Sequence, residues 1–373
     1  MRIALLTYST KPRGGVVHTL SLAEALAAQG ESVTVVTLGR GGDRAFFREV
    51  DPAVELQVIP FTEPVSPETV GERVIRSIAV LRAAFDRDRF DVVHAQDCIT
   101  ANAVPGAIRT VHHLDRFTTE ELARCHERGI VGAARHVCVS DAVAAELADG
   151  WGITATVIPN GVDFRRFEAA AADNSVASDA RRRWAAVVGA PYILTVGGIE
   201  PRKGSLDLAE AFARARLLGL PAAIRLVVAG GETLFDYRTY REAFADRCTA
   251  LGIDPIVLGP VAHDDLPALV AGAAVFAFPS LKEGFGLAAL EAAAAGVPLV
   301  VRDLPVLKAL LRGAAAFAAD PTSLGFAIHD AFESPDRIAV TKARKVAASF
   351  SWERAARAHR QLYSEMLDTA GRP

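Results

Sequence analysis

Short runs of apolar residues alternate along the chain with longer segments rich in alanine, leucine and arginine. The short runs are apolar at consecutive positions, which is typical of strands buried on both faces of a parallel sheet. The longer segments have the composition of helices. This alternation predicts βαβ units around parallel sheets, and therefore an α/β fold. The predicted strands of a first series are Arg2–Leu6, Ser32–Leu38, Leu56–Ile59, Asp91–His94, Arg109–His112, His136–Val139 and Thr156–Ile158.

A second series of strands follows residues 169–184, a segment without strand character, although residues 181–188 could form a helix. We therefore expect an N-terminal domain over residues 1–170, a linker over 171–188, a C-terminal domain over 189–350 and a C-terminal helix over 351–373. With 373 residues, 51% of them hydrophobic, the chain can bury two ordinary cores. Ligands of open α/β sheets bind outside the carboxyl ends of the strands, so a cleft between two such domains is the expected site. The predicted strands of the second series are Tyr192–Val196, Arg225–Val228, Ile256–Leu258, Val275–Phe278 and Leu299–Val301.

Charge and cysteine content narrow the function classes. The chain has 41 Lys and Arg residues against 44 Asp and Glu residues, a net charge of −3, which does not favour a nucleic-acid partner. Cys98, Cys125, Cys138 and Cys248 form no C-x-x-C pair, which argues against a disulfide framework and a structural zinc site. The apolar run Ile3–Leu6 is too short for a signal-peptide core or a membrane helix, so we expect a cytoplasmic protein.

Glycines stand where two predicted strands pass into helices. Gly14 and Gly15 follow the first strand, where they either form a simple turn or leave the first N–H groups of the next helix open to an anion. In the second series, Arg202 and Lys203 directly precede Gly204 and a helix. Two cations at such a junction are suited to hold a diphosphate and stabilise a phosphate leaving group, or they belong to a solvated loop.

Two carboxylates accompany the stretch Glu-Gly-Phe-Gly at residues 283–286 and the alanine-rich helix that follows it. If the whole segment were helical, the eight positions from Glu283 to Glu291 would separate the carboxylates by about 12 Å. The paired acids of glycoside hydrolases are closer, at roughly 5–9.5 Å. We interpret Glu283 and Glu291 as separate acceptors for the hydroxyl groups of one elongated ligand, to which the glycines expose the N–H groups of the helix start.

This region resembles a known family. Residues 279–300, PSLKEGFGLAALEAAAAGVPLV, resemble the P-S-x-x-E-G-F-G-L-x-x-L-E-A-x-A-x-G-x-P-V signature of the retaining glycosyltransferases of family 4, with Glu283 and Glu291 at its two acid positions. The stretches VIPNGVDFRRF, TVGGIEPRKG, VLGPVAHDDLPALVAGA and the terminal FSWERAA resemble further blocks of this family in the same order. The resemblance spans nearly the whole chain.

The resemblance implies a GT-B fold, in which two Rossmann-like, doubly wound parallel-sheet domains face across a cleft and the last helix crosses back to the first domain. It implies transfer of a hexosyl group from a nucleotide-diphosphate sugar with retention, and we expect neither a cofactor nor a bound metal. Lys203 would bind the diphosphate, Glu291 the ribose and Glu283 the sugar hydroxyls, with Lys203 and Glu283 also implied in catalysis. The other implied donor contacts are Gly15, Arg202, Val261 and the backbone amides of Phe285, Gly286 and Leu287.

The chain departs from the family pattern at a phosphate contact and on the acceptor side. The family commonly has arginine where this chain has Gly198, so either Arg202 compensates or the phosphates are held more weakly. IRTVHHLDRF resembles the block whose histidine lies near the reacting sugar, which implies a catalytic role for His112 and places His113 where aspartate is commoner. DVVHAQD resembles D-V-V-H-A-H, which makes Asp97 a candidate acceptor contact or a cap of the next helix.

The sequence leaves the acceptor and the nucleotide base open. The acceptor could be a small molecule, a glycan or a lipid-linked molecule, bound by loops 40–47 and 114–119. Phe46 and Phe47 suggest either a weak peripheral membrane contact or an ordinary loop. The same fold also admits a nucleotide-sugar epimerase, a phosphorylase or a non-catalytic nucleotide-sugar-binding protein. Asp86 and Asp88 form a D-x-D motif, which is typical of metal sites in another glycosyltransferase fold. Here the motif lies in a charged segment that we interpret as a solvated helix end.

Overall fold

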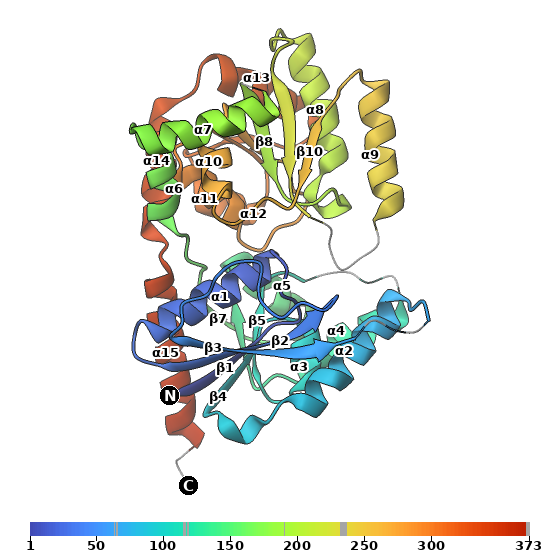
Figure 1. Cartoon of the computed structure of the whole chain (residues 1–373), viewed down its shortest axis with the longest axis vertical. Coiled ribbons are helices and arrows are strands. Elements are labelled where there is room, and N and C mark those ends of the chain that lie inside the picture. Colours follow the sequence, from blue (N-terminus) through green and yellow to red (C-terminus); the bar gives the residue numbers. More distant parts are fainter. Residues whose placement is uncertain are drawn as a thin grey trace. The chain divides into compact units, whose positions relative to one another are not determined.

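Strands and helices alternate to form one parallel sheet in each of two units, so the predicted α/β class is confirmed (Figure 1). The computed structural model describes residues 1–62, 64, 66–114, 117, 119–189, 191–231 and 237–370. The first unit comprises residues 1–161 together with the C-terminal segment from Ser351, and the second comprises Val162–Phe350.

The first unit contains a seven-stranded parallel sheet in the order β3-β2-β1-β4-β5-β6-β7. Because β1 pairs with both β2 and β4, the strand order reverses direction beside β1, as in Rossmann-like sheets. Its strands are β1 Arg2–Leu6, β2 Ser32–Arg40, β3 Val54–Phe61, β4 Val92–Ala95, β5 Ile108–Val111, β6 Arg135–Cys138 and β7 Thr156–Val157. Its helices are α1 Gly14–Ala27, α2 Val70–Ala84, η1 Arg87–Arg89, α3 Cys98–Ala103, α4 Glu120–Val131, α5 Asp141–Trp151 and α15 Trp352–Ala370.

The second unit contains a six-stranded parallel sheet in the order β10-β9-β8-β11-β12-β13. Here the order reverses beside β8, which pairs with β9 and β11. Its strands are β8 Tyr192–Val196, β9 Arg225–Ala229, β10 Ile256–Gly259, β11 Val275–Phe278, β12 Leu299–Arg302 and β13 Ala316–Ala318. Its helices are α6 Phe164–Ala170, α7 Ser175–Val188, η2 Pro201–Lys203, α8 Ser205–Leu217, α9 Arg238–Ala250, α10 Leu266–Ala271, α11 Leu287–Ala294, α12 Pro305–Leu311, α13 Pro321–Glu333 and α14 Arg337–Ser349.

Helix α15 completes the core of the first unit although it ends the chain. Ala356 and Tyr363 of α15 are fully buried among the residues that β1, β2 and α1 contribute, including Leu5 and Leu20. The hydroxyl group of Tyr363 shares a hydrogen bond of 2.7 Å with Nδ1 of His94 on β4. Burial of these side chains stabilises the first unit by about 25 cal/mol per Å² of apolar surface removed from water.

The segment expected to be a linker is largely helical. Asn174 caps α7 by accepting a hydrogen bond of 2.9 Å from the backbone N–H of Ala177, and Asp163 caps α6 in the same way. Both helices pack against α10 of the second unit. The structure therefore divides the chain after Gly161, ahead of the expected boundary at residue 170, and residues 162–188 belong to the second unit.

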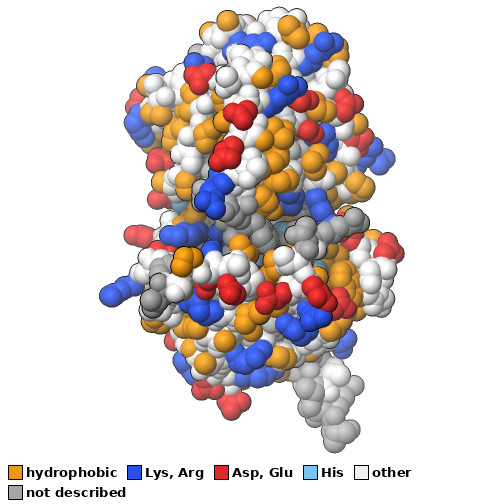
Figure 2. Space-filling view, turned by 90° about the vertical axis from the view of Figure 1, so that its right-hand side faces the viewer, with side chains coloured by type: hydrophobic (Ala, Val, Ile, Leu, Met, Phe, Trp, Pro, Cys, Tyr) orange, Lys and Arg blue, Asp and Glu red, His pale blue; other side chains and the backbone are white. Residues whose placement is uncertain are grey.

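Surface charges are interspersed in the structure. On the face drawn in Figure 2, Lys and Arg side chains alternate with Asp and Glu side chains among apolar ones. Among the described helices, none combines the length and the apolar character needed to cross a membrane.

Candidate active site

The loop between β8 and α8 brings Arg202 and Lys203 beside the loop that follows β11. Gly204 has a left-handed backbone with φ of 65°, and a Cβ atom there would collide with the carbonyl oxygen of Pro279. Glycine is therefore required where the two loops approach each other. Lys203 lines a small cavity at this junction together with Gly197, Gly198, Ser205 and Pro279.

Glu283 forms ion pairs with the two cations of this junction. Nζ of Lys203 donates to Oε1 of Glu283 at 2.5 Å, and a guanidinium nitrogen of Arg202 donates to the same oxygen at 3.3 Å. The Glu283 side chain is only 10% exposed, so burial opposes its charged form, but the two cations outweigh burial and hold its pKa below the usual value. Glu283 is therefore ionised and can only accept hydrogen bonds.

The glycine that precedes α11 opens the start of this helix. Gly286 has a φ of 97°, and a Cβ atom there would lie 2.8 Å from Cδ2 of Leu307, so this turn excludes larger residues. Because its N-cap residue is Gly286, α11 has no cap side chain on the backbone N–H groups of its first turn. Phe285 is buried and packs edge-on against Phe350, with ring centroids 5.5 Å apart. The helix start, with its partial positive charge, thus follows Glu283 by only a few residues.

Glu291 lies two turns along α11 in a different environment. Burial raises its pKa to about 7, Arg166 opposes this rise and Asp163 adds to it. The two carboxylates predicted from the sequence therefore belong to one loop-helix segment, but their pKa values shift in opposite directions. Val261, the expected base contact, is half-buried in the loop that follows β10.

His112 and Gly15 meet in the first unit. A Cβ atom on Gly15 would lie 3.6 Å from Cδ2 of His112, and His18 packs edge-on against His112 with ring centroids 4.7 Å apart. Burial, followed by the nearby groups His113, His94 and Arg109, lowers the pKa of His112 to about 3. His112 is therefore neutral at physiological pH and can act as a hydrogen-bonding group rather than as a cationic acid.

His18 is a buried packing residue that contacts His112. It is 1% exposed, and its Nδ1 shares a hydrogen bond of 2.9 Å with Oδ1 of Asn160. Its ring also lies edge-on to Trp352 of α15. The position of His18 one turn into α1 was visible in the sequence, but its burial depends on α15, which is distant along the chain.

Asp97 caps helix α3 in the structure. One of its carboxylate oxygens accepts from the backbone N–H of Thr100 at 2.9 Å, and the other accepts from the backbone N–H of Tyr8 at 3.0 Å. Burial raises its pKa to about 6, although these hydrogen bonds and Arg109 favour the charged form. Of the two roles expected for Asp97, the structure shows the cap. His113 is half-buried directly after His112.

Three other expectations have plain structural outcomes. Of the two interpretations of Phe46 and Phe47, the structure agrees with an ordinary loop, because Phe46 is 7% exposed and both rings pack against the core of the first unit. Asp86 accepts from the backbone N–H of Asp88 and caps η1, which is an ordinary local role. In the expected acceptor loop 114–119, residues 115, 116 and 118 lie outside the described residues.

Comparison with known proteins gives matches over most of the chain. The family model described as Glycosyltransferase Family 4 matches residues 12–166, and the model described as Glycosyl transferases group 1 matches residues 177–337. A D-inositol 3-phosphate glycosyltransferase of Salinispora arenicola is 28% identical, over 99% of this chain and 93% of that protein.

Two solved structures are similar over almost their full length. The sucrose-phosphate synthase of Thermosynechococcus elongatus has a TM-score of 0.79 and 20% identity, and the alignment covers 98% of this chain and 99% of that one. The Anabaena protein HepE, solved in complex with UDP-glucose, has a TM-score of 0.71 and 18% identity over 98% of this chain and 99% of that one. These likenesses and the two parallel sheets confirm the expected GT-B fold.

Proposed function

Because the chain belongs to the group 1 glycosyltransferases of family 4, we propose that it transfers a hexosyl group from a nucleoside diphosphate sugar to an acceptor hydroxyl with retention of anomeric configuration. The observation that carries the proposal is the contact of Lys203 with Glu283 beside the glycine turns at Gly204 and Gly286. This contact brings a cation for the diphosphate and a carboxylate for sugar hydroxyls together in two neighbouring loops of the second unit, a few residues before a helix that starts at a glycine.

Donor binding exchanges partners within this ion pair. Without donor, Lys203 and Glu283 neutralise each other at 2.5 Å. The diphosphate takes over the hydrogen bonds of Lys203, and the carboxylate of Glu283 then accepts from hydroxyl groups of the sugar. Arg202 pairs with both Glu200 and Glu283 and so contributes a second cation to this junction. It compensates for the arginine that the family commonly has at the position of Gly198.

The start of α11 stabilises the leaving group. As the bond between the anomeric carbon and the phosphate oxygen breaks, negative charge develops on the diphosphate. The amides at Gly286 and Leu287 and the Lys203 ammonium favour that charge, and such groups contribute most where they are already fixed in place. Gly286 fixes the backbone of this turn through its left-handed conformation.

The transfer proceeds on one face of the sugar. The acceptor oxygen forms a bond to the anomeric carbon on the side from which the diphosphate departs, and the acceptor proton passes to a phosphate oxygen of the leaving group. Atoms and charge balance in this step without a protein nucleophile, a metal or another cofactor. In this scheme Glu283 accepts hydrogen bonds from the sugar hydroxyls, and no bond forms between its carboxylate and the anomeric carbon.

Glu291 and His112 contact the donor through hydroxyl groups. The carboxylate of Glu291 accepts from the ribose hydroxyls, which favour its ionised form. His112 uses a neutral imidazole as donor or acceptor for a sugar hydroxyl, in agreement with its low pKa. The edge-on contact with His18 holds the His112 ring in one orientation.

The names of the similar proteins suggest the first substrates to test. HepE was solved with UDP-glucose, which supports UDP-glucose as the first candidate donor. The Salinispora arenicola protein is named for D-inositol 3-phosphate and the Thermosynechococcus elongatus protein for sucrose phosphate, which support a small polyol or sugar acceptor.

Turnover with defined donors tests the proposal. The protein is incubated with UDP-glucose, UDP-N-acetylglucosamine, GDP-mannose and ADP-glucose, each with inositol and sugar acceptors and with their phosphates. Release of nucleoside diphosphate is measured, and NMR gives the anomeric configuration of the product. A product with the configuration of the donor supports retaining transfer, and an inverted product contradicts it. A C2-epimerised nucleotide sugar would assign the chain to the epimerases, and binding without turnover would make it a binding protein.

A further inference from the structure

An alternating row of arginines and aromatic rings occupies the carboxyl ends of three neighbouring strands in the first unit. The guanidinium carbon of Arg13 lies 5.3 Å from the ring centroid of Tyr8, which follows β1. Arg40, at the end of β2, lies 5.5 Å from the Tyr8 centroid and 5.1 Å from that of Phe61 at the end of β3. Arg76 lies 3.9 Å from the Phe61 centroid. Cation–π contacts thus hold three guanidinium groups at one end of the sheet.

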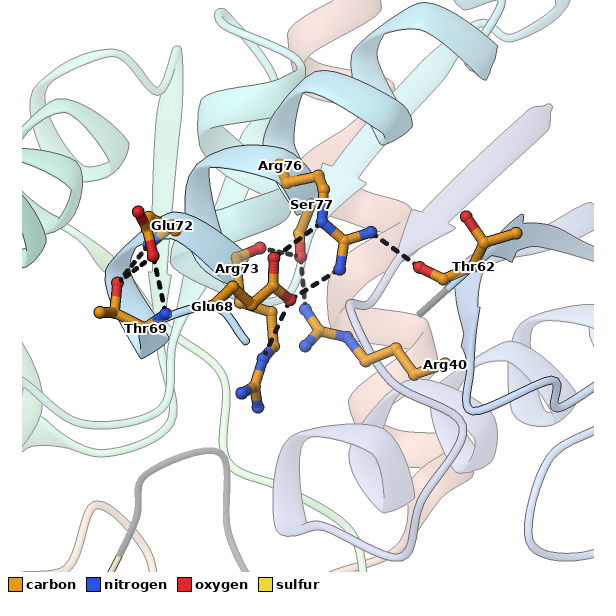
Figure 3. Close-up of polar contacts among 8 residues, drawn as sticks. All are labelled: Arg40, Thr62, Glu68, Thr69, Glu72, Arg73, Arg76 and Ser77. Carbon is orange, nitrogen blue, oxygen red and sulfur yellow. Dashed lines mark hydrogen bonds and ion pairs between the residues drawn. The ribbon is translucent and has the colours of Figure 1, made fainter. Parts of the chain in front are cut away.

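Helix α2 adds a further arginine to this row (Figure 3). Arg73 pairs with Glu68 at 3.3 Å, and Arg76 pairs with the same carboxylate at 2.6 Å. Arg40 donates to the hydroxyl group of Ser77 at 2.6 Å. Figure 3 shows the guanidinium groups of Arg73 and Arg76 at Glu68 and that of Arg40 at the hydroxyl group of Ser77. We call Arg13, Arg40, Arg73 and Arg76 the arginine cluster.

Positive charge exceeds negative charge in this region. Arg73 and Arg76 pair with Glu68, which lies near Glu72. The buried Asp97 at the N-cap of α3 acts on Arg40, so four guanidinium groups stand against three carboxylates. Burial, together with the neighbouring charges of Arg13 and Arg73, lowers the pKa of Arg40 to about 10 against the opposing effects of Tyr8 and Asp97. Within the described part of the chain, Nε of Arg13 and Nε of Arg40 are buried without a hydrogen-bond partner. An anion bound here would relieve both the repulsion and the unpaired donors.

We propose that the arginine cluster binds a phosphate monoester carried by the acceptor of the glycosyl transfer, an inference that rests on the function proposed above. A phosphate monoester carries close to two negative charges and three oxygens, which match several guanidinium forks better than one carboxylate does. The carboxyl ends of β1, β2 and β3 are also where open α/β sheets bind ligands. Arg73 is 38% exposed and Arg76 29%, so solvent reaches the cluster. The phosphate positions the acceptor and takes no part in bond breaking.

Calorimetry with matched sugars tests the proposal. Glucose 6-phosphate, glucose and inorganic phosphate are titrated into the intact protein, into Arg40→Gln and into Arg13→Gln. Arg89→Gln is the control, because Arg89 is an exposed arginine of the same unit that precedes β4 at the opposite end of the sheet. We expect glucose 6-phosphate to bind at least tenfold more tightly than glucose, and each cluster substitution to reduce its affinity by about ten- to a hundredfold, as for hydrogen bonds to charged groups. Arg89→Gln should leave the affinity unchanged.

Further readouts separate binding from a purely structural role of the arginines. Arg40→Lys keeps the charge but loses the paired N–H donors of the guanidinium group, so this variant should bind glucose 6-phosphate with intermediate affinity. Thermal unfolding of each variant shows whether the fold is retained. Equal affinities for glucose 6-phosphate and glucose in the intact protein, or folded Arg40→Gln and Arg13→Gln proteins that bind glucose 6-phosphate as the intact protein does, would overturn the proposal.

The source of the phosphate and the link to catalysis are tested separately. Vesicles containing phosphatidic acid present a phosphate monoester on a lipid, and retention on them that Arg40→Gln abolishes would identify a lipid-linked source. Binding of glucose 6-phosphate without turnover of any donor would support the anion site and count against the proposed function. Turnover with neutral acceptors only, unchanged in Arg40→Gln, would support the function and overturn the anion site.

Discussion

The carboxyl ends of the two sheets differ in their balance of charge. In the second unit, Arg202 and Lys203 are matched by Glu200 and Glu283 within a few ångströms. In the first unit, the arginine cluster outnumbers its nearby carboxylates, and buried Nε atoms lack a partner among the described residues. Two sheets of related topology thus differ at the carboxyl ends of their strands: charges are balanced in the second unit and positive charge is in excess in the first.

This difference indicates two modes of ligand binding. In the second unit a donor must replace existing partners, so its diphosphate competes with Glu283 for Lys203. In the first unit an anion binds among cations and relieves their mutual repulsion. We therefore expect substitutions in the second unit to alter turnover, and substitutions in the arginine cluster to alter mainly the choice of acceptor.

Loss of Lys203 should have the largest effect. Lys203→Ala removes the nearest cation from a carboxylate that is 10% exposed and removes a diphosphate contact, so kcat/KM should fall by about 10²- to 10³-fold. Steady-state measurement of nucleoside diphosphate release checks this. Lys308→Ala is the control, since Lys308 is half-exposed and pairs with Asp303 in the same unit. A Lys203→Ala enzyme as active as the control would remove Lys203 from the site.

Neutralising Glu283 should separate sugar recognition from diphosphate binding. Glu283→Gln removes the competitor of the diphosphate for Lys203, so nucleoside diphosphate should bind as tightly as in the intact protein or more tightly. Turnover should fall by about 10- to 100-fold, because charge-assisted hydrogen bonds to sugar hydroxyls are lost. Calorimetry with the nucleotide and kinetics with the sugar nucleotide measure the two effects. Weaker nucleotide binding with unchanged turnover would contradict the exchange of partners.

Glu291 should make the stability of the protein depend on pH. Its folded pKa of about 7 lies above the reference value of 4.5, so the protonated side chain favours folding below about pH 4.5, and this contribution is lost as the pH rises through 7. Between pH 5 and pH 8 the intact protein should therefore lose on the order of 1–3 kcal/mol of unfolding free energy relative to Glu291→Gln. Denaturant unfolding at both pH values checks this, and parallel stability curves for the two proteins would show that Glu291 does not titrate in this range.

Most strands and part of the candidate site were predictable, because apolar runs and the residues that directly follow them can be recognised locally in the sequence. Gly204 and Glu283 were identified from residues adjacent in sequence to predicted strands, and the structure places them in neighbouring loops. The missed elements have weaker local patterns. Strand β13 is three residues long, and of α7 only residues 181–188 were expected as a possible helix, whereas the helix starts after the cap that Asn174 provides.

The arginine cluster could not be predicted from the sequence. Tyr8, Arg40 and Phe61 are more than 20 residues apart, and each alone is an ordinary strand-end residue. Only the pairing of β2 with both β1 and β3 brings their side chains into one row. The burial of His18 depends similarly on α15, whose first residue is Trp352.

A crystal structure of the protein with bound nucleoside diphosphate tests donor binding at the Lys203–Glu283 pair most directly. We expect Nζ of Lys203 to lie about 3 Å from a diphosphate oxygen, with Glu283 freed from its 2.5 Å contact with Lys203. A nucleotide bound elsewhere, with the Lys203–Glu283 contact intact, would contradict the proposed donor site.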